Sequence, residues 1–325
     1  MSESIFKEIT LRRREILEKV NPQNVELAQS YLKYINISSL KRETINIKIQ
    51  LLLHYLNYIY ERLNDKALTD VTISEMEDYF LYLSKCGLKP SSISTKMNGL
   101  SVFYKYLISK GVTQFNPMYY LKRPKKEYER DHKCFLTKKQ IEILKEKLEE
   151  NGDRTLQAYA FFSLSTGARV TAVSSIRWEQ IDFEKRMVYN VKEKFSNYCT
   201  LMFSEYVKKL LLRLRSEREL NKVNDGGWLF PSPVRFYKEN TVEVRHVTSA
   251  TLGKWAHKIG EMCGVPELTP HSFRHTCSNL LLQNGGDIAI TSLVLHHKSI
   301  STTLQNYVNL KDTNFLLQYK DQFGI

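Results

Sequence analysis

The sequence has no apolar run that approaches the roughly 18 residues that a membrane span requires. The N-terminal segment, residues 1–20, carries charges inside its apolar stretch and so lacks the core of a secretory signal peptide. The five cysteines are odd in number and widely scattered, with no CxxC pair and no compact metal-binding spacing. We therefore expect no membrane anchor, a cytoplasmic location, and reduced thiols that fill the core or are incidental.

Acidic residues are also in deficit. The chain has 35 Asp and Glu against 48 Lys and Arg, which gives a formal charge of +13 over 325 residues. Such an excess favours a polyanionic partner, because a protein that neutralises phosphates releases their counterions. A basic surface without a nucleic-acid role is the alternative. The hydrophobic share of 42% indicates a globular protein, and the length indicates two domains.

Residues 1–121 read as a compact bundle of four or five helices. Helix-breaking residues divide the region at Asn21-Pro22, Cys86-Gly87, Pro90, Gly111 and Asn116-Pro117. Between these points apolar residues recur at helical spacing. The two clearest stripes are Ile45, Ile49, Leu52, Leu53, Leu56, Ile59 and Leu63, and Ile93, Met97, Leu100, Tyr104 and Leu107.

A linker is predicted at residues 122–134, where apolar periodicity stops and basic residues accumulate. It is either a solvated tether or a segment that follows phosphates between two basic domains. The basic residues are Lys122, Arg123, Lys125, Lys126, Arg130 and Lys133.

Residues 135–325 are predicted to form the larger domain. Thr137 is a suitable N-cap for a helix through Leu148, and a second helix, Leu156–Leu164, ends at Thr166-Gly167. The segments 187–191 and 198–202 read as a β-hairpin with its turn near 194–197. Beyond Phe203 we expect mostly helix. The predicted fold class is mainly α with a small antiparallel β-sheet.

Three segments of this larger domain carry the chemistry. They are STGARVTAVSSIRWEQID (165–182), LTPHSFRHTCSNLLLQNGGDI (268–288) and LVLHHKSISTTLQNYV (293–308). In this order and at these separations they resemble the tyrosine recombinase, or phage integrase, family. The resemblance covers most of the chain, since residues 1–121 look like the family's core-binding domain, including its closing Asn116-Pro117.

The resemblance implies a two-domain clamp around double-stranded DNA and site-specific recombination without a cofactor or a metal. Strands would be cut and rejoined through a 3′-phosphotyrosyl intermediate and a Holliday junction. Such a protein would be associated with the nucleoid through its DNA. Two rival functions are a type IB topoisomerase-like relaxase, which uses similar residues without partner exchange, and a DNA-binding regulator with a dead site.

Two arginines and a histidine fit phosphoryl transfer on chemical grounds. The pentavalent transition state gains negative charge on its equatorial oxygens, which two fixed guanidiniums, Arg169 and Arg274, can hold bidentately. His271 lies three residues before Arg274, on the same helix face, and follows Pro270, which suits a helix start. Its imidazole is suited to proton transfer at the phosphate.

Three further roles come from the resemblance. It implies that His297 donates a hydrogen bond to the scissile phosphate, and that Lys194, in the hairpin turn, protonates the leaving 5′-oxygen. Lys192 is the rival for that role. The nucleophile is Tyr307, with Tyr319 as the other nearby tyrosine; neighbouring cations would favour its phenolate. A metal site at His271, His275, His296 and His297 is the competing interpretation, without a carboxylate cluster to support it.

Three positions depart from the family pattern. Ala172 replaces the acidic residue usual three positions after the first arginine, and His296 replaces the glycine usual before the second histidine. Nine residues separate His297 from Tyr307, one more than expected.

Candidate DNA-binding residues lie in both domains. The start of the helix that runs to Ser109 carries polar and basic residues opposite its apolar stripe, which suits phosphate contacts; N-capping by Ser91 or Ser92 is the simpler role. These residues are Lys89, Ser91, Ser92, Thr95 and Lys96. The linker adds Lys125 and Lys126, and the larger domain adds Arg245 and Lys254, followed by Arg235, Lys238 and Lys258.

The C-terminal tail is apolar. It contains Phe315, Leu316, Leu317, Tyr319, Phe323 and Ile325, which would be costly in solvent. It either folds back on its own domain or, as the resemblance implies, docks in a neighbouring subunit and links a homotetramer on two duplexes.

Overall fold

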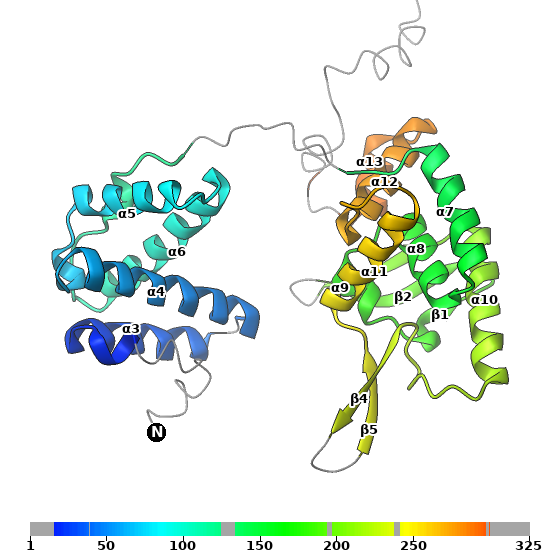
Figure 1. Ribbon diagram of the computed structural model, residues 1–325, viewed down its shortest axis with the longest axis horizontal. Coiled ribbons are helices and arrows are strands. Elements are labelled where there is room, and N and C mark those ends of the chain that lie inside the picture. Colours follow the sequence, from blue (N-terminus) through cyan, green and yellow to red (C-terminus); the bar gives the residue numbers. More distant parts are fainter. Residues whose placement is uncertain are drawn as a thin grey trace, which may run out of the picture. The chain divides into compact units, whose positions relative to one another are not determined.

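The computed structural model describes residues 16–38, 40–124, 134–193, 197–236, 241–296 and 299, with the side chains of 233–242 excepted. The chain divides into two compact units, Met1–Glu129 and Arg130–Ile325. The boundary between them falls inside the segment 122–134 that the sequence assigns to a linker. Figure 1 labels the elements of each unit.

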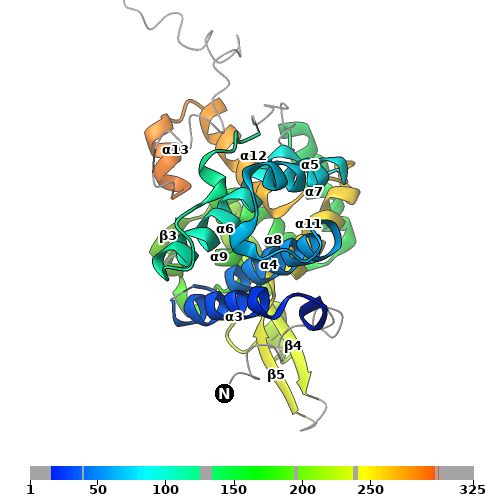
Figure 2. The same cartoon turned by 90° about the vertical axis from the view of Figure 1, so that its left-hand side faces the viewer.

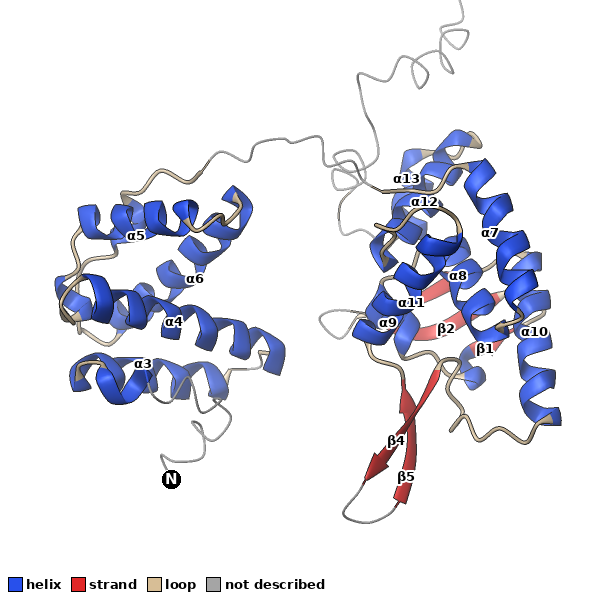
Figure 3. Cartoon of the chain, in the orientation of Figure 1, coloured by secondary structure: helices blue, strands red, loops and turns tan. Residues whose placement is uncertain are grey.

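The first unit is helical throughout its described residues, as predicted (Figure 3). Its elements are α3 (Pro22–Ile37), α4 (Arg42–Arg62), η1 (Leu68–Asp70), α5 (Ile73–Lys85), α6 (Pro90–Ser109) and η2 (Pro117–Tyr119). The proline at each of three breaker points opens an element, because its missing N–H is not needed in a first turn. Thr72 closes a capping box with Glu75 at the start of α5.

The predicted stripes form the core of this unit. Ile49, Leu56 and Ile59 of α4 are buried, and so is every residue of the α6 stripe. Six tyrosines are buried in this core. The four most deeply buried are Tyr31, Tyr55, Tyr79 and Tyr104, and the Oη atoms of Tyr55 and Tyr104 are 2.9 Å apart. Burial raises the pKa values of these four, as for Tyr31, whose pKa rises to about 12. These side chains are packed aromatics rather than nucleophiles.

The second unit contains helices and two small antiparallel sheets. Its elements are α7 (Lys138–Asn151), α8 (Arg154–Thr166), α9 (Val170–Ser174), η3 (Trp178–Gln180), β1 (Ile181–Asp182), β2 (Met187–Lys192), β3 (Tyr198–Met202), α10 (Glu205–Leu220), β4 (Pro231–Phe236), β5 (Thr241–His246), α11 (Ser249–Met262), α12 (Pro270–Gln283) and α13 (Ile288–Val294). The fold is mainly α with small antiparallel sheets, as predicted.

Helix α8 is the centre of this unit. Nearly all of its side chains are buried, and it packs against α7, α10, α11 and α12 (Figure 1). A helix that is apolar on every face belongs in a core. Thr137 caps α7 as predicted, with a capping box to Gln140, and Gly167 ends α8 in the left-handed region.

The hairpin β2–β3 forms where the sequence predicts it. Val188 pairs with Leu201 and Val191 with Cys199, and a bulge lies between these two pairs. Asn190 has a positive φ of 54° within the bulge. The extra residue lets Val188 and Val191 both face the core, which simple alternation does not allow.

The expectation of mostly helix beyond Phe203 is confirmed by α10, α11, α12 and α13, but it did not include the strands β4 and β5. These strands pair from Pro231–His246 to Phe236–Thr241 as a two-stranded ribbon. In Figures 1 and 2 the ribbon extends away from the helices of its unit. Proline disfavours a central strand because it lacks an N–H donor. Strand β4 has no second neighbour in its described sheet, so it tolerates Pro231 and Pro233.

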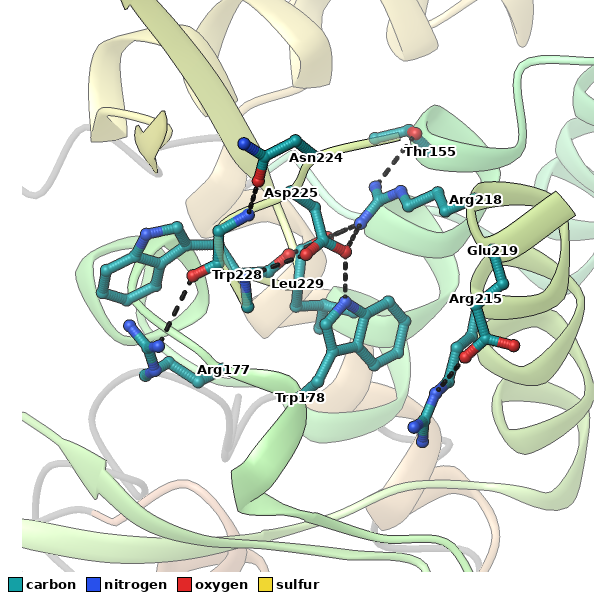
Figure 4. Close-up of polar contacts among 12 residues, drawn as sticks. Thr155, Arg177, Trp178, Arg215, Arg218, Glu219, Asn224, Asp225, Trp228 and Leu229 are labelled. Atoms are coloured by element: carbon teal, nitrogen blue, oxygen red, sulfur yellow. Dashed lines mark hydrogen bonds and ion pairs between the residues drawn. The ribbon is translucent and has the colours of Figure 1, made fainter. Parts of the chain in front are cut away.

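A buried arginine ties α10 to the loop before this ribbon (Figure 4). Nη1 of Arg218 lies 3.4 Å from Oδ2 of Asp225 and donates to the Leu229 carbonyl at 3.0 Å. The same carboxylate oxygen accepts a bond from the Trp178 indole at 2.7 Å. Only 9% of the Arg218 side chain is exposed. The carboxylate therefore balances a cation that water does not reach.

We expect Asp225→Ala to lower the free energy of unfolding of this unit by about 3 kcal/mol, because it leaves a buried guanidinium without a counter-charge. The exposed pair Arg215–Glu219, 3.0 Å apart in α10, supplies the control. Glu219→Ala should cost roughly 0.5 kcal/mol or less. Urea unfolding followed by tryptophan fluorescence isolates this unit, since all three tryptophans lie in it. Equal losses for the two variants would contradict the assignment.

Candidate active site

Arg169 stands at the junction of α8 and α9. Gly167 turns the chain there with φ of 58°, and a Cβ at that position would lie 2.7 Å from Cδ2 of Leu295. A side chain is therefore excluded on both conformational and steric grounds. Two residues later Arg169 takes the N-cap position of α9, so it opens a helix directly after the turn.

Arg274 projects from the first turns of α12. That helix begins at Pro270 with a capping box between Thr269 and Ser272, which matches the predicted start. The Arg274 residue is only 2% exposed. Its Nη1 donates to the Gly167 carbonyl at 2.7 Å, and its Nη2 donates to the Leu295 carbonyl. Burial and two backbone acceptors hold this guanidinium in one orientation.

The three sequence segments meet at these arginines. Arg274 belongs to the second segment. It donates to the Gly167 carbonyl of the first segment and to the Leu295 carbonyl of the third segment, at the end of α13. Arg169 reaches the same end of α13, where its Nη2 donates to the His296 carbonyl at 3.5 Å. Segments more than one hundred residues apart therefore place two guanidiniums around one point, as an anionic ligand requires.

His271 and His275 lie one turn apart on α12, with ring centroids 4.3 Å apart in an edge-to-face arrangement. The His271 residue is exposed, whereas His275 is buried. The helix thus directs Arg274 inward and leaves His271 accessible from outside the unit. An accessible imidazole beside a buried guanidinium is suited to proton transfer.

Glu193 is a site residue that the sequence reasoning missed. Its Oε2 lies 2.6 Å from Nη1 of Arg169, and 9% of its side chain is exposed. The strand pattern could have indicated Glu193. Val191 lies in the core, and side chains two residues apart lie on the same face of a strand, which places Glu193 on the inward face. A carboxylate on the inward face of a strand needs a partner.

Burial shifts the pKa values of several side chains around the two arginines. Burial, and then the negative charge of Glu193, raises the pKa of Cys199 to about 11, while the two arginines act in the opposite direction. Burial raises the pKa of Cys277 to about 12. Burial likewise lowers the pKa of His296, which leaves a neutral imidazole at neutral pH. Electrostatic interactions are strengthened in such a site.

Two departures from the family pattern have a structural description. Ala172 is fully buried in α9, so no carboxylate approaches Arg169 from that helix. His296 has a φ of 50°, in the left-handed region that a glycine adopts without strain. Histidine is among the residues that tolerate this region better than most.

Several predicted site residues lie outside the described residues. They are Lys194, His297 and Tyr307, with the alternative Tyr319 and the linker residues Lys125 and Lys126. Lys192, the rival of Lys194, is described. Its side chain is exposed and falls on the opposite face of β2 from Val191 and Glu193, the face that does not approach Arg169.

Most of the other predicted DNA contacts that the structure describes are exposed, while Lys238 and the side chain of Arg235 lie outside the described part. Lys89 is the N-cap of α6 and no side chain caps that helix, so the simpler role of Ser91 or Ser92 as the cap is wrong. Lys89, Ser91, Ser92 and Thr95 are exposed and Lys96 is half-buried. Arg245 forms an ion pair with Glu243 at 2.7 Å, and Lys254 is exposed on α11.

The described part of the chain contains neither a metal-binding cluster nor a helix suited to span a membrane. No group of three or more His, Cys, Asp or Glu side chains there is placed to hold a metal ion. None of its helices is long and apolar enough to cross a membrane.

Residues 134–314 match the model of the phage integrase family. Among curated proteins, the tyrosine recombinase XerC of Staphylococcus saprophyticus is 28% identical over 238 residues, which cover 70% of this chain and 74% of that protein. XerC of Staphylococcus carnosus is 26% identical over the same shares of the two chains.

Solved structures show the same fold. The Tn1549 transposon integrase, residues 82–397, in complex with circular intermediate DNA, matches with a TM-score of 0.70 and 16% identity over 92% of this chain and all of that one. A λ integrase dimer bound to a COC′ core site matches with a TM-score of 0.68 and 16% identity, over 94% of this chain and 83% of that one. XerH recombinase in a post-cleavage complex with its palindromic difH substrate matches with a TM-score of 0.68 and 16% identity. The match covers 95% of this chain and 93% of that one.

Proposed function

The chain belongs to the phage integrase family of tyrosine recombinases, and from this premise we propose that it recombines DNA at specific sites through a covalent bond to Tyr307. The observation that carries the proposal is the meeting of Arg169 and Arg274 at the end of α13. That arrangement gathers the three motif segments around one anion site.

The two arginines stabilise the phosphate as it becomes pentavalent. Arg274 is held by backbone carbonyls and buried, so it is oriented before DNA arrives. Arg169 is about one-third exposed and adds the second guanidinium. His271, on the accessible side of α12, exchanges protons at the phosphate.

Three residues outside the described part complete the mechanism that we propose. Tyr307 attacks the phosphorus, so a phosphotyrosyl bond forms as the bond to the 5′-oxygen breaks. Lys194 gives its proton to that leaving oxygen, and His297 donates a hydrogen bond to the phosphate. The exposed position of Lys192 on the far face of β2 favours Lys194 for this role. The phosphotyrosyl ester conserves the bond energy, so a 5′-hydroxyl rejoins the strand without ATP.

DNA is held by both units. The exposed start of α6 contacts phosphates through Lys89, Ser91, Ser92 and Thr95, with Lys96 beside them. Lys125, Lys126, Arg245 and Lys254 extend the contact along the linker and the second unit. Four protomers assemble on two duplexes, with residues 1–121 as the core-binding domain and 135–325 as the catalytic domain. The protein acts in the cytoplasm, with the nucleoid.

Truncation after Asn314 tests the assembly. Every proposed catalytic residue precedes the tail, while several large apolar side chains, each contributing about 1.5–3 kcal/mol when buried, are lost. We expect single-site binding to stay nearly intact and the slowest gel-shift species, two duplexes with four protomers, to disappear. A truncated protein that still forms this species and recombines normally would show that the tail packs within its own protomer.

Covalent trapping tests the proposed function itself. The protein is incubated with a library of genomic DNA fragments, the mixture is denatured, and DNA that stays attached to protein is recovered and sequenced. We expect one sequence family to be enriched, attached through a 3′-phosphate. Absence of any attached DNA would leave only a DNA-binding regulator, and attachment without sequence preference would favour the topoisomerase-like alternative.

A further inference from the structure

Arg169 is the more exposed of the two site arginines, and its ion pair with Glu193 is its shortest described polar contact. Nη1 of Arg169 and Oε2 of Glu193 are 2.6 Å apart. The carboxylate side chain is 9% exposed, so the pair is largely protected from solvent screening. Within the described residues Oε1 of Glu193 is buried and has no hydrogen-bond partner. Arg169 is therefore the main described partner that stabilises this buried carboxylate.

Glu193 also closes the turn that carries Lys194. Its backbone N–H donates to the Asn197 carbonyl at 2.8 Å, across a connection of only three residues, 194–196. Before this point the strands pair through Lys192–Tyr198 and Val191–Cys199. The backbone of Glu193 therefore fixes the base of the turn, while its side chain reaches the α8–α9 junction.

The two arginines are held in different ways. Arg274 is buried and bonded to two backbone carbonyls. Arg169 is one-third exposed, and its other described hydrogen bond, to the His296 carbonyl, is long at 3.5 Å. Helix α9 contains no carboxylate, and Ala172 is fully buried in it. A flexible guanidinium with a single long bond to a carbonyl needs another fixed partner to stay oriented.

We propose that Glu193 is a positioning residue that holds Arg169 at the end of strand β2 and so aims its guanidinium at the scissile phosphate. A guanidinium has five N–H donors, so one edge holds the carboxylate while others stay available to phosphate oxygens. The inference rests on the proposed function. It assigns to the β2–β3 hairpin a second task, which is orientation of Arg169 in addition to delivery of Lys194.

Single-turnover cleavage of a nicked duplex that carries the recovered target sequence tests this role. We expect Glu193→Ala to slow covalent-adduct formation by roughly 10- to 100-fold, as a displacement near 1 Å does, with duplex affinity nearly unchanged. Glu193→Gln, which keeps the shape and an acceptor without the charge, should fall between Glu193→Ala and wild type. Glu219→Ala removes a surface pair in the same unit and should cleave like wild type.

A double-mutant cycle with Arg169→Lys separates positioning from a general loss of structure. If Glu193 acts through Arg169, adding Glu193→Ala to Arg169→Lys should slow cleavage by less than about twofold further. Full additivity, or a Glu193→Ala protein as fast as wild type, would overturn the inference. A faster Glu193→Ala protein would instead make the carboxylate a competitor of the phosphate. If the wild type forms no adduct at all, the proposed function fails rather than this inference.

Discussion

Tyr307→Phe is expected to bind the target duplex nearly as well as wild type and to form no covalent adduct. The substitution removes one oxygen, and that oxygen is the nucleophile that we propose. Phenol has a pKa of about 10, so attack at neutral pH needs nearby cations. In the proposed mechanism Arg169 and Arg274, which meet at the end of α13, would supply them. A duplex nicked near the cleavage point traps the wild-type protein, and denaturing electrophoresis counts the adduct.

Tyr319→Phe is the matched control for this experiment. Tyr319 lies in the same C-terminal region, and its phenol is the alternative nucleophile. It should form adduct, although its place in the apolar tail allows a lower yield through weaker assembly. Adduct from Tyr307→Phe together with none from Tyr319→Phe would transfer the role to Tyr319. Tyr31 and Tyr55 of the first unit are poor candidates, since burial raises the pKa of both phenols.

The second large effect is expected at Lys194. A 5′-alkoxide is a poor leaving group, so loss of the proposed proton donor in Lys194→Ala should slow cleavage by about 10²- to 10⁴-fold. A substrate with sulfur in place of the bridging 5′-oxygen releases a thiolate, which needs no proton. We expect this substrate to restore most of the rate. The measurement is the single-turnover rate of adduct formation on the two substrates.

Lys192→Ala is the control for Lys194, because it removes the same charge two residues away. Its side chain lies on the exposed face of β2, opposite to Val191 and Glu193. We expect Lys192→Ala to cleave both substrates at close to the wild-type rate. A slow Lys192→Ala protein that the sulfur substrate rescues, beside a normal Lys194→Ala, would show that Lys192 is the proton donor.

Local signals in the sequence predicted much of the fold. Thr137 and Pro270 mark helix starts because capping and proline geometry act within a single turn. The apolar stripes of α4 and α6 predicted the core of the first unit. The strands at 187–192 and 198–202 followed from their composition. Each of these depends on residues close together in the chain.

Features that depend on tertiary contacts escaped prediction. The partnership of Arg169 with Glu193 joins positions 24 residues apart, and the bulge at Asn190 changes which strand residues face inward. Arg218 reads as a surface residue of a charged helix, yet it is buried against Asp225. The β4–β5 ribbon was missed because Pro231 and Pro233 disfavour a strand that has two neighbours, which this one lacks.

Strand exchange between two differently labelled duplexes tests the central claim most directly. Both duplexes carry the recovered target sequence, differ in length, and are mixed with the protein without ATP. We predict recombinant strands that join one label to the other, preceded by a four-way junction, and none with Tyr307→Phe. Covalent cleavage and resealing that always restores the parental strands, however long the reaction runs, would contradict the account and indicate a relaxase.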